Sequence, residues 1–195
     1  MPGSERRDRE KVVVRGRILA AALQLLETEG APGVTMRRVA EAVDYTAPII
    51  YQHFANKDAL IGELVRQGYD ELVRRLETAS HDADIDARLA AAASEYLRFA
   101  GENAHLFEAM NGTALGAAER RAAAESVIGV LSKLIDDWAE THQVTLEVPQ
   151  AYEIIWGTLY GIAALGRLES IGQARARRLG VNALRLLLSG WRSIS

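Results

Sequence analysis

The side chains best suited to chemistry lie close together between residues 35 and 60, in the stretch TMRRVAEAVDYTAPIIYQHFANKDAL. Hydroxyls, an imidazole and an ammonium group recur there, at Thr35, Thr46, Tyr51, His53 and Lys57. Such groups donate hydrogen bonds to phosphate oxygens. Thr35 and Lys57 fall at expected helix N-termini, where free N–H groups and the helix dipole favour anions. The segment therefore has the chemistry of an anion-binding surface.

Catalysis and metal binding need clusters that this sequence lacks. The four histidines (His53, His81, His105 and His142) are scattered, with no His-x-x-x-His pair and no carboxylate set of the di-iron type. There is no cysteine, which excludes disulfides, thiolate metal sites and cysteine nucleophiles. No Gly-rich phosphate loop follows a strand, because strand signals are nearly absent. We expect no enzyme, no metal site and no cofactor.

The elements that position these groups are two short helices after a longer one, with helix-turn-helix proportions. Thr46 is expected to cap the second short helix, and Pro48 falls within its first turn, where a missing N–H costs nothing. Ile50 and Phe54 are spaced to face inward. The remaining surface would meet DNA, and the predicted DNA-binding residues are Thr35, Arg37, Tyr45, Thr46, Ala47, Tyr51, Gln52, His53 and Lys57.

Helical periodicity continues through the rest of the 195 residues and predicts an all-α protein of about nine helices. The composition, 49% apolar and 25% charged, is that of a globular protein, and no apolar run is long enough to span a membrane. Without a signal segment, the expected compartment is the cytoplasm. The net charge of −3 argues against generic nucleic-acid binding, although residues 1–17 hold six basic groups against three acidic ones.

The segment T-x-x-x-V-A-x-A-V-D-Y-T-x-x-I-I-Y-x-H-F-x-N-K-D-x-L (35–60) resembles the DNA-binding signature of the TetR family of transcriptional regulators. The resemblance implies phosphate-contacting roles for Thr35, Thr46, Tyr51, His53 and Lys57. It also implies an N-terminal three-helix DNA-binding domain and a larger C-terminal domain that binds a ligand and forms a dimer.

Two positions depart from the family pattern. The usual Gly of the turn is Asp44, which must hold a left-handed conformation that Asp tolerates better than most residues. The usual Val is Tyr45, whose ring either reaches a phosphate or tunes which bases are read. For the basic N-terminal run, a disordered tail and an arm that follows the DNA backbone both stay open.

The C-terminal part is less diagnostic. Trp156, Leu159 and Gly161 resemble a Trp-x-x-Leu-His-Gly motif of one C-terminal domain type in this family, with Tyr160 in place of His. The glycines at 157, 161 and 166 indicate close helix packing, either within the chain or on a second copy. We expect a dimer through helices at about 150–168 and 174–190. An unknown small apolar or aromatic ligand is expected to contact Tyr96, Phe99, His105, Phe107, Met110, Trp138, Tyr152 and Trp156.

The sequence thus predicts a DNA-binding and N-terminal arm region at 1–56, a connecting helix at 57–80, and a ligand-binding and dimerisation domain at 81–195. The expected function is a dimeric repressor that a small molecule releases from a palindromic operator on double-stranded DNA. Two alternatives stay open: a helical protein-interaction module, and a DNA-binding regulator that needs no ligand.

Overall fold

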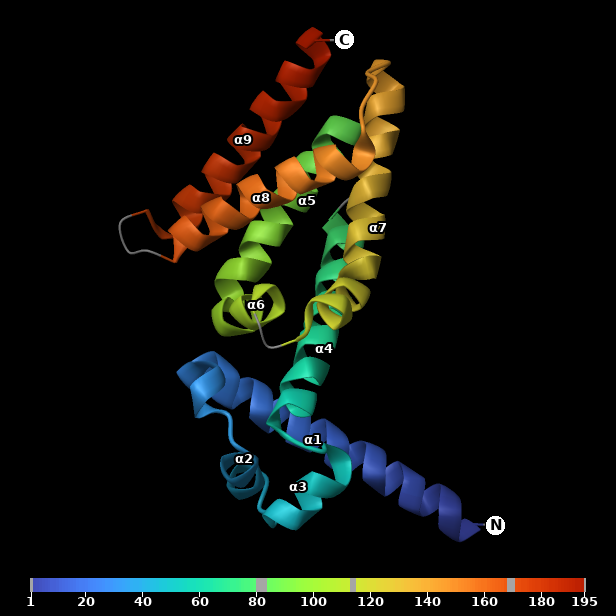
Figure 1. The fold of residues 1–195 in the computed structure, drawn as a ribbon, viewed down its shortest axis with the longest axis vertical. Coiled ribbons are helices and arrows are strands. Elements are labelled where there is room, and N and C mark those ends of the chain that lie inside the picture. Colours follow the sequence, from blue (N-terminus) through green and yellow to red (C-terminus); the bar gives the residue numbers. More distant parts are fainter. Residues whose placement is uncertain (1, 80–83, 113–114, 168–170, 195) are drawn as a thin grey trace. The chain divides into compact units, whose positions relative to one another are not determined.

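The computed structural model describes residues 2–79, 84–112, 115–167 and 171–194, with the side chains of 2–5 left out. The described residues form nine helices and no strand (Figure 1). The predicted all-α fold is confirmed. The helices are α1 (Pro2–Gly33), α2 (Met36–Ala42), α3 (Ala47–His53), α4 (Lys57–Ala79), α5 (Ile85–Glu102), α6 (Ala104–Asn111), α7 (Ala117–His142), α8 (Val148–Gly166) and α9 (Gly172–Ile194).

The chain packs as two compact units, and neither is continuous in sequence. Unit 1 comprises residues 1–68 and 105–120, and unit 2 comprises residues 69–104 and 121–195. Helix α4 therefore begins in unit 1 and ends in unit 2, while α6 belongs by its packing to unit 1. The functional division expected at residues 56 and 80 stays a prediction, and its second boundary lies beside residues outside the described ranges.

The first helix of unit 1 starts much earlier than its apolar pattern requires. Helix α1 is already helical at Pro2, so the basic N-terminal run is part of a helix rather than a disordered tail. Its apolar stripe of Ile18, Ala22 and Leu26 is fully buried. The expected stop signal at Gly30 is confirmed by a φ of 71°, which interrupts the helix before its last residues.

Helix α6 is held on unit 1 by a carboxylate from α1. The Glu27 side chain accepts the backbone N–H of His105 at 3.4 Å and that of Leu106 at 2.9 Å, two donors that the start of a helix leaves unpaired. Two glycines of α4 allow side chains of α6 and of the segment after it to approach the α4 backbone closely. A Cβ at Gly68 would lie 2.9 Å from the Met110 sulfur, and one at Gly62 would lie 2.9 Å from a Leu115 methyl.

Unit 2 is organised around α9, which packs against both α5 and α8. Small residues make this contact possible. A Cβ at Gly180 of α9 would overlap Leu97 and lie 3.2 Å from a Leu159 methyl, and a Cβ at Gly166 would lie 2.8 Å from that of Ala176. The close approach predicted for the glycines of α8 is therefore found within the chain at Gly166.

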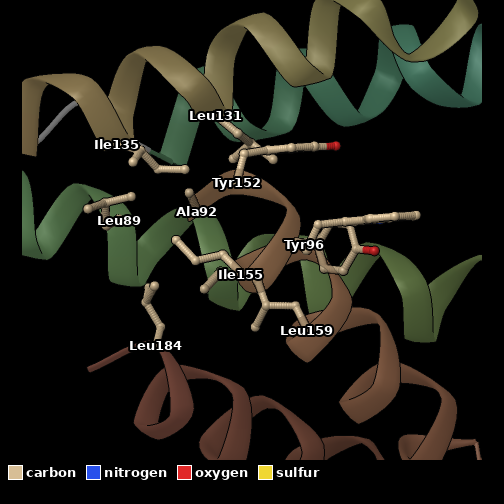
Figure 2. Close-up of a pocket in the computed structure, with 11 residues that line it drawn as sticks. Leu89, Ala92, Tyr96, Leu131, Ile135, Tyr152, Ile155, Leu159 and Leu184 are labelled. Carbon is tan, nitrogen blue, oxygen red and sulfur yellow. The ribbon is translucent and has the colours of Figure 1, made fainter. Parts of the chain in front are cut away.

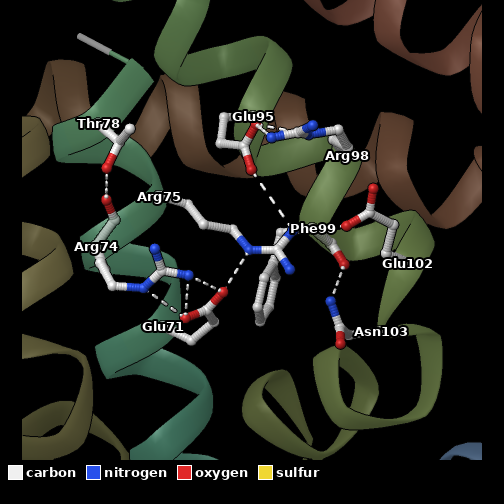
Figure 3. A network of polar contacts seen from close by, with 9 residues as sticks. All are labelled: Glu71, Arg74, Arg75, Thr78, Glu95, Arg98, Phe99, Glu102 and Asn103. Carbon is white, nitrogen blue, oxygen red and sulfur yellow. Dashed lines mark hydrogen bonds and ion pairs between the residues drawn. The ribbon is translucent and has the colours of Figure 1, made fainter. Parts of the chain in front are cut away.

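A network of charged side chains joins α4 to α5 within unit 2 (Figure 3). Arg75 lies at its centre, 2.7 Å from a Glu71 oxygen, 2.6 Å from Glu102 and 3.6 Å from Glu95. The guanidinium also lies 5.5 Å from the centre of the Phe99 ring. Glu95 is the one charged residue buried among the described residues, so its pairing with Arg75 and Arg98 offsets the cost of removing a carboxylate from water.

A second carboxylate gathers three helices at the other end of α5. Asp86 accepts hydrogen bonds from Trp138 Nε1 at 3.0 Å, His142 Nε2 at 2.9 Å and the Arg192 guanidinium at 2.7 Å. Burial by itself would raise the pKa of Asp86, but these hydrogen bonds outweigh it and hold the pKa below its ordinary value. One side chain thereby ties the start of α5 to the ends of α7 and α9.

The α5–α8–α9 contact predicts opposite effects for two Gly→Ala substitutions. Gly180→Ala must displace the buried Leu97, so it should lower the free energy of unfolding by about 1–3 kcal/mol. Gly129→Ala on α7 is the matched control. It has nothing within 4 Å among the described residues, and it should raise that free energy by up to about 1 kcal/mol through helix propensity. Urea unfolding followed by circular dichroism measures both, and equal effects would contradict this packing.

The Arg75 network predicts a loss of stability in acid. Hydrogen bonds from Arg74 and then Arg75 lower the pKa of Glu71, and a hydrogen bond from Arg75 lowers that of Glu102. Because the folded pKa values are depressed, the stabilisation is complete above the unfolded value of about 4.3 and is lost as the pH falls through the folded values. In Arg75→Ala, the free energy of unfolding should therefore fall less between about pH 5 and pH 3 than in the wild type.

Arg121→Ala is the control for this measurement, since it removes the same charge from an exposed site of unit 2 with no ion pair among the described residues. It should keep the acid dependence of the wild type. Parallel pH profiles for all three proteins would show that the network is not what acid disrupts.

Candidate nucleic-acid interface and ligand pocket

The turn between α2 and α3 is set by backbone geometry at Asp44. Its φ of 57° is left-handed, as the sequence predicts. The N–H of Tyr45 donates to the Ala40 carbonyl at 2.9 Å, and that of Asp44 to the Glu41 carbonyl at 3.3 Å. These two bonds close a Schellman motif, which ends α2 and fixes the direction in which the chain enters α3.

The two threonines at the helix starts behave differently. Thr35 caps α2 as predicted, and its hydroxyl accepts the Arg38 N–H at 3.2 Å. Thr46 precedes α3 with extended backbone, but its side chain makes no capping bond, so that prediction was wrong. Of the two N–H groups that a capping hydroxyl can bind, Pro48 removes one, and the other, that of Ile49, donates to the Thr46 carbonyl at 3.0 Å. The Thr46 side chain is left exposed.

Helix α3 buries one side and exposes the other, in the pattern of a helix that reads DNA. Ile50 and Phe54 are buried as predicted. Tyr51 is 53% exposed and Gln52 is exposed, while Ala47 and His53 are partly exposed. Burial first, and then the charges of Arg15 and Lys11, lower the pKa of His53, which favours the neutral form of its ring.

The predicted phosphate-binding residues outside α3 flank it. Lys57 is the first residue of α4, and its ammonium group donates to the Ala31 carbonyl at 2.6 Å, which leaves two further N–H donors. Arg37 is exposed and forms an ion pair with Glu41 at 2.9 Å. The ring of Tyr45 lies under Arg17, whose guanidinium carbon is 5.6 Å from the ring centre. The nine predicted residues thus all belong to unit 1.

A pocket in unit 2 is lined almost entirely by carbon (Figure 2). Its side chains come from α5, α7, α8 and α9, and they close in on a cavity of about 20 Å³, which has room for about one water molecule. Tyr96, Tyr152 and Trp156 of the predicted ligand set line it. The aliphatic lining residues are Leu89, Ala92, Ala93, Leu131, Ile135, Ile155, Leu159 and Leu184. These eight are not among the predicted ligand residues, since an aliphatic residue in a pocket has the same helical spacing as one in a core.

The other five residues of the predicted ligand set do not line this pocket. Phe99 and Trp138 are fully buried elsewhere in unit 2. His105, Phe107 and Met110 belong to unit 1, where a His105 ring nitrogen lies 2.9 Å from the Glu27 carbonyl oxygen. Neither Asp86 nor Glu27 was singled out in the sequence, because isolated acidic residues on helices give no signal of the contacts they make.

Two further observations bear on the kind of protein this is. In the described part of the chain, no group of three or more His, Asp or Glu side chains is placed to hold a metal ion. Likewise, none of the described helices is both long and apolar enough to cross a membrane.

Comparison with known proteins identifies the family. Residues 18–64 match the family described as "Bacterial regulatory proteins, tetR family", and residues 89–183 match the family described as "Tetracyclin repressor-like, C-terminal domain". The chain therefore belongs to the TetR family. It is a DNA-binding transcriptional regulator, of a family whose members are generally not enzymes.

Individual relatives agree with this assignment. The chain is 40% identical over 50 residues to the tetracycline repressor protein class G of Vibrio anguillarum, a match that covers 26% of this chain and 24% of that protein. A protein of unknown function from Rhodococcus sp. RHA1 has the same fold, with a TM-score of 0.78, 22% identity, and coverage of 91% of this chain and 95% of that one.

Two solved regulators also share the fold. The fatty acid degradation regulator FadR of Bacillus halodurans superposes with a TM-score of 0.74 at 17% identity, covering 89% of this chain and 94% of that one. The regulator PfmR of Thermus thermophilus superposes with a TM-score of 0.69 at 21% identity, covering 89% and 97%. At such identities the likeness extends to the fold alone.

The left-handed Asp44 predicts how the turn responds to substitution. Asp44→Val should lower the free energy of unfolding by about 1–2 kcal/mol, because a β-branched residue is strained at positive φ. Asp44→Gly should change it by less than about 0.5 kcal/mol, since glycine accepts this φ but loses more chain entropy on folding. Ala42→Val, at an exposed helical position of α2, controls for the added side chain. Equal losses at 42 and 44 would contradict the turn geometry.

Proposed function

We propose that this chain is a homodimeric repressor that binds a palindromic operator and is released from it by a small apolar or aromatic ligand. The observation that carries the proposal is the exposed side of α3, held by a fixed turn and flanked by Thr35, Arg37 and Lys57. In this proposal, phosphates are bound by Thr35, Thr46, Tyr51, His53 and Lys57. Gln52 and Ala47 face base edges, where an amide can pair with adenine and a methyl group with thymine.

Dimerisation through α8 and α9 is supported by what these helices expose. Among the described residues of unit 2, the large apolar side chains that are exposed all lie on these two helices: Ile154, Trp156, Leu165, Leu179, Leu186 and Ile194. Gly157 and Gly161 of α8 have nothing within 4 Å of a Cβ position in the described chain. A helix of a second copy would cover both features, and two-fold symmetry would match the two halves of a palindrome.

Regulation by a ligand is supported by the carbon-lined pocket of unit 2, since ligand pockets combine apolar walls with a few polar groups. In this proposal the ligand enters by moving the lining side chains apart. Helix α4 connects that unit to the unit that contains α3, the proposed DNA-reading helix, because its first residues belong to unit 1 and its last to unit 2. In this proposal the dimer has two conformations, which differ in the distance between the two copies of α3. The ligand acts by binding one of these conformations more tightly than the other. A ligand-independent regulator would differ in showing no effect of any pocket ligand on DNA affinity.

The experiment that tests the proposal is selection of bound duplexes from a random DNA pool by the purified protein at near-physiological salt. Enrichment of a palindrome with half-sites about one helical turn apart supports a dimeric reader of the helix-turn-helix type. Enrichment of a single, non-repeated site would contradict the dimer. Failure to enrich any sequence would favour a helical module that binds protein partners instead.

The selected operator allows the residue roles to be separated. Lys57→Ala should weaken binding to all duplexes and reduce the slope of log K against log salt concentration by about 1.8, which is 0.9 for each subunit's lost phosphate contact. Tyr51→Phe should also weaken binding to all sequences, but without the change in slope, because the hydroxyl is uncharged. Gln52→Ala should instead alter base preference. A Lys57→Ala variant with an unchanged slope would contradict its phosphate role.

A further inference from the structure

The apolar stripe of α1 changes into a basic stripe where the helix leaves its packed neighbours. The buried residues Ile18, Ala22 and Leu26 recur every four residues. Stepping further toward the N-terminus, the same face carries Arg15, Lys11 and Arg7, which lie within an arc of about 80° at 100° per residue. The face that is buried in one half of the helix is therefore positively charged in the other half.

Arg15 fixes this stripe beside the end of the reading helix. Its guanidinium lies 4.4 Å from the centre of the Phe54 ring, directly after α3, and 3.1 Å from a Glu63 oxygen of α4. The charges of Arg15 and Lys11 both act on His53, the last residue of α3. The basic stripe is thus next to the proposed DNA-binding surface within the same unit, and Figure 1 shows α1 continuing beyond α3 toward its N-terminus.

The acidic residues of this segment do not neutralise the stripe. Arg6 forms an ion pair with Glu10 at 3.3 Å, on another face of the helix. Arg7 and Lys11 are exposed, and neither forms an ion pair or a side-chain hydrogen bond within the ranges the structure describes. Residues 18–195 hold seventeen basic and twenty-three acidic groups. The positive charge at the start of α1 therefore stands against an otherwise acidic chain.

We propose that Arg7 and Lys11 bind phosphates of the same DNA duplex that α3 reads, so that α1 extends the backbone contact beyond the helix-turn-helix. The stripe from Arg7 to Arg15 is about 12 Å long, at 1.5 Å per residue. That length spans about three base pairs of DNA. The proposal rests on the DNA binding proposed above and adds two charged contacts per subunit to it. An acidic protein surface would suit the same charges, but the neighbouring reading helix favours a duplex.

The test compares two arginines that lie two residues apart on opposite sides of α1. Arg7→Ala removes a charge from the stripe, and Arg9→Ala removes the same charge about 200° around the helix, with the same change in helix propensity. Lys11→Ala is the second stripe variant. Each protein is titrated with the selected operator across a range of salt concentrations, and ethylation interference maps the phosphates that matter.

Arg7→Ala and Lys11→Ala should each reduce the slope of log K against log salt by about 1.8 for the dimer, and the pair together by about 3.6. In the stripe variants, ethylation of a short run of phosphates should no longer interfere with binding. In Arg9→Ala, ethylation of the same phosphates should still interfere. Equal slopes for Arg7→Ala and Arg9→Ala, with an unchanged interference map, would overturn the proposal while leaving operator binding intact. A wild-type protein that binds no duplex would overturn the proposed function as well.

Circular dichroism of the variants shows whether α1 stays helical, as alanine should ensure. If the stripe variants bind DNA like the wild type but lose affinity for an acidic protein, the partner of the stripe is that protein and not the duplex.

Discussion

The positions of the exposed groups on α3 depend on two side chains buried beneath it, Ile50 and Phe54. Helix α3 has seven residues, and isolated helices much shorter than about 12 residues are marginal in water. Its order therefore comes from burying these two residues, each of which contributes about 1.5–3 kcal/mol when fully removed from water. Arg15 covers the Phe54 ring from α1, and the Asp44 turn sets the entry from α2. The polar groups of the reading helix have defined positions only because these contacts hold it.

Much of this arrangement can be predicted from the sequence, because it depends on local rules. Threonine before a helix, proline in a first turn and a residue suited to positive φ all leave signals within a few residues, and they located α2, the turn and α3. The predicted cap at Thr46 is wrong for an equally local reason, since Pro48 lacks one donor and the Ile49 N–H bonds to the Thr46 carbonyl. The sequence does not decide whether the start of α1 is helical, because its mixed charges carry no apolar period.

Features that depend on contacts between distant segments could not be predicted in the same way. The Glu27 cap of α6 joins positions 78 and 79 residues apart, and Asp86 joins α5 to a residue 106 positions later. The predicted ligand set depends on residue type alone. The structure divides its residues among the pocket, the core of unit 2 and unit 1, a division that only tertiary packing decides. The glycines of α8 likewise share one sequence pattern but have different surroundings. Gly166 packs within the chain, whereas Gly157 and Gly161 face no described neighbour.

The discontinuity of unit 1 has a consequence for how the protein is made. Residues 1–68 contain the whole helix-turn-helix, yet Gly62 and Gly68 are covered by Leu115, Leu106 and Met110 from the later segment 105–120. During synthesis, a ribosome that has completed the DNA-reading helices has not yet supplied the residues that close their unit. The first unit can finish folding only after the chain has emerged past residue 120, when α5 of the second unit has also been made. The segments of the two units are therefore synthesised in an interleaved order, and unit 1 is complete before the last segment of unit 2 is made.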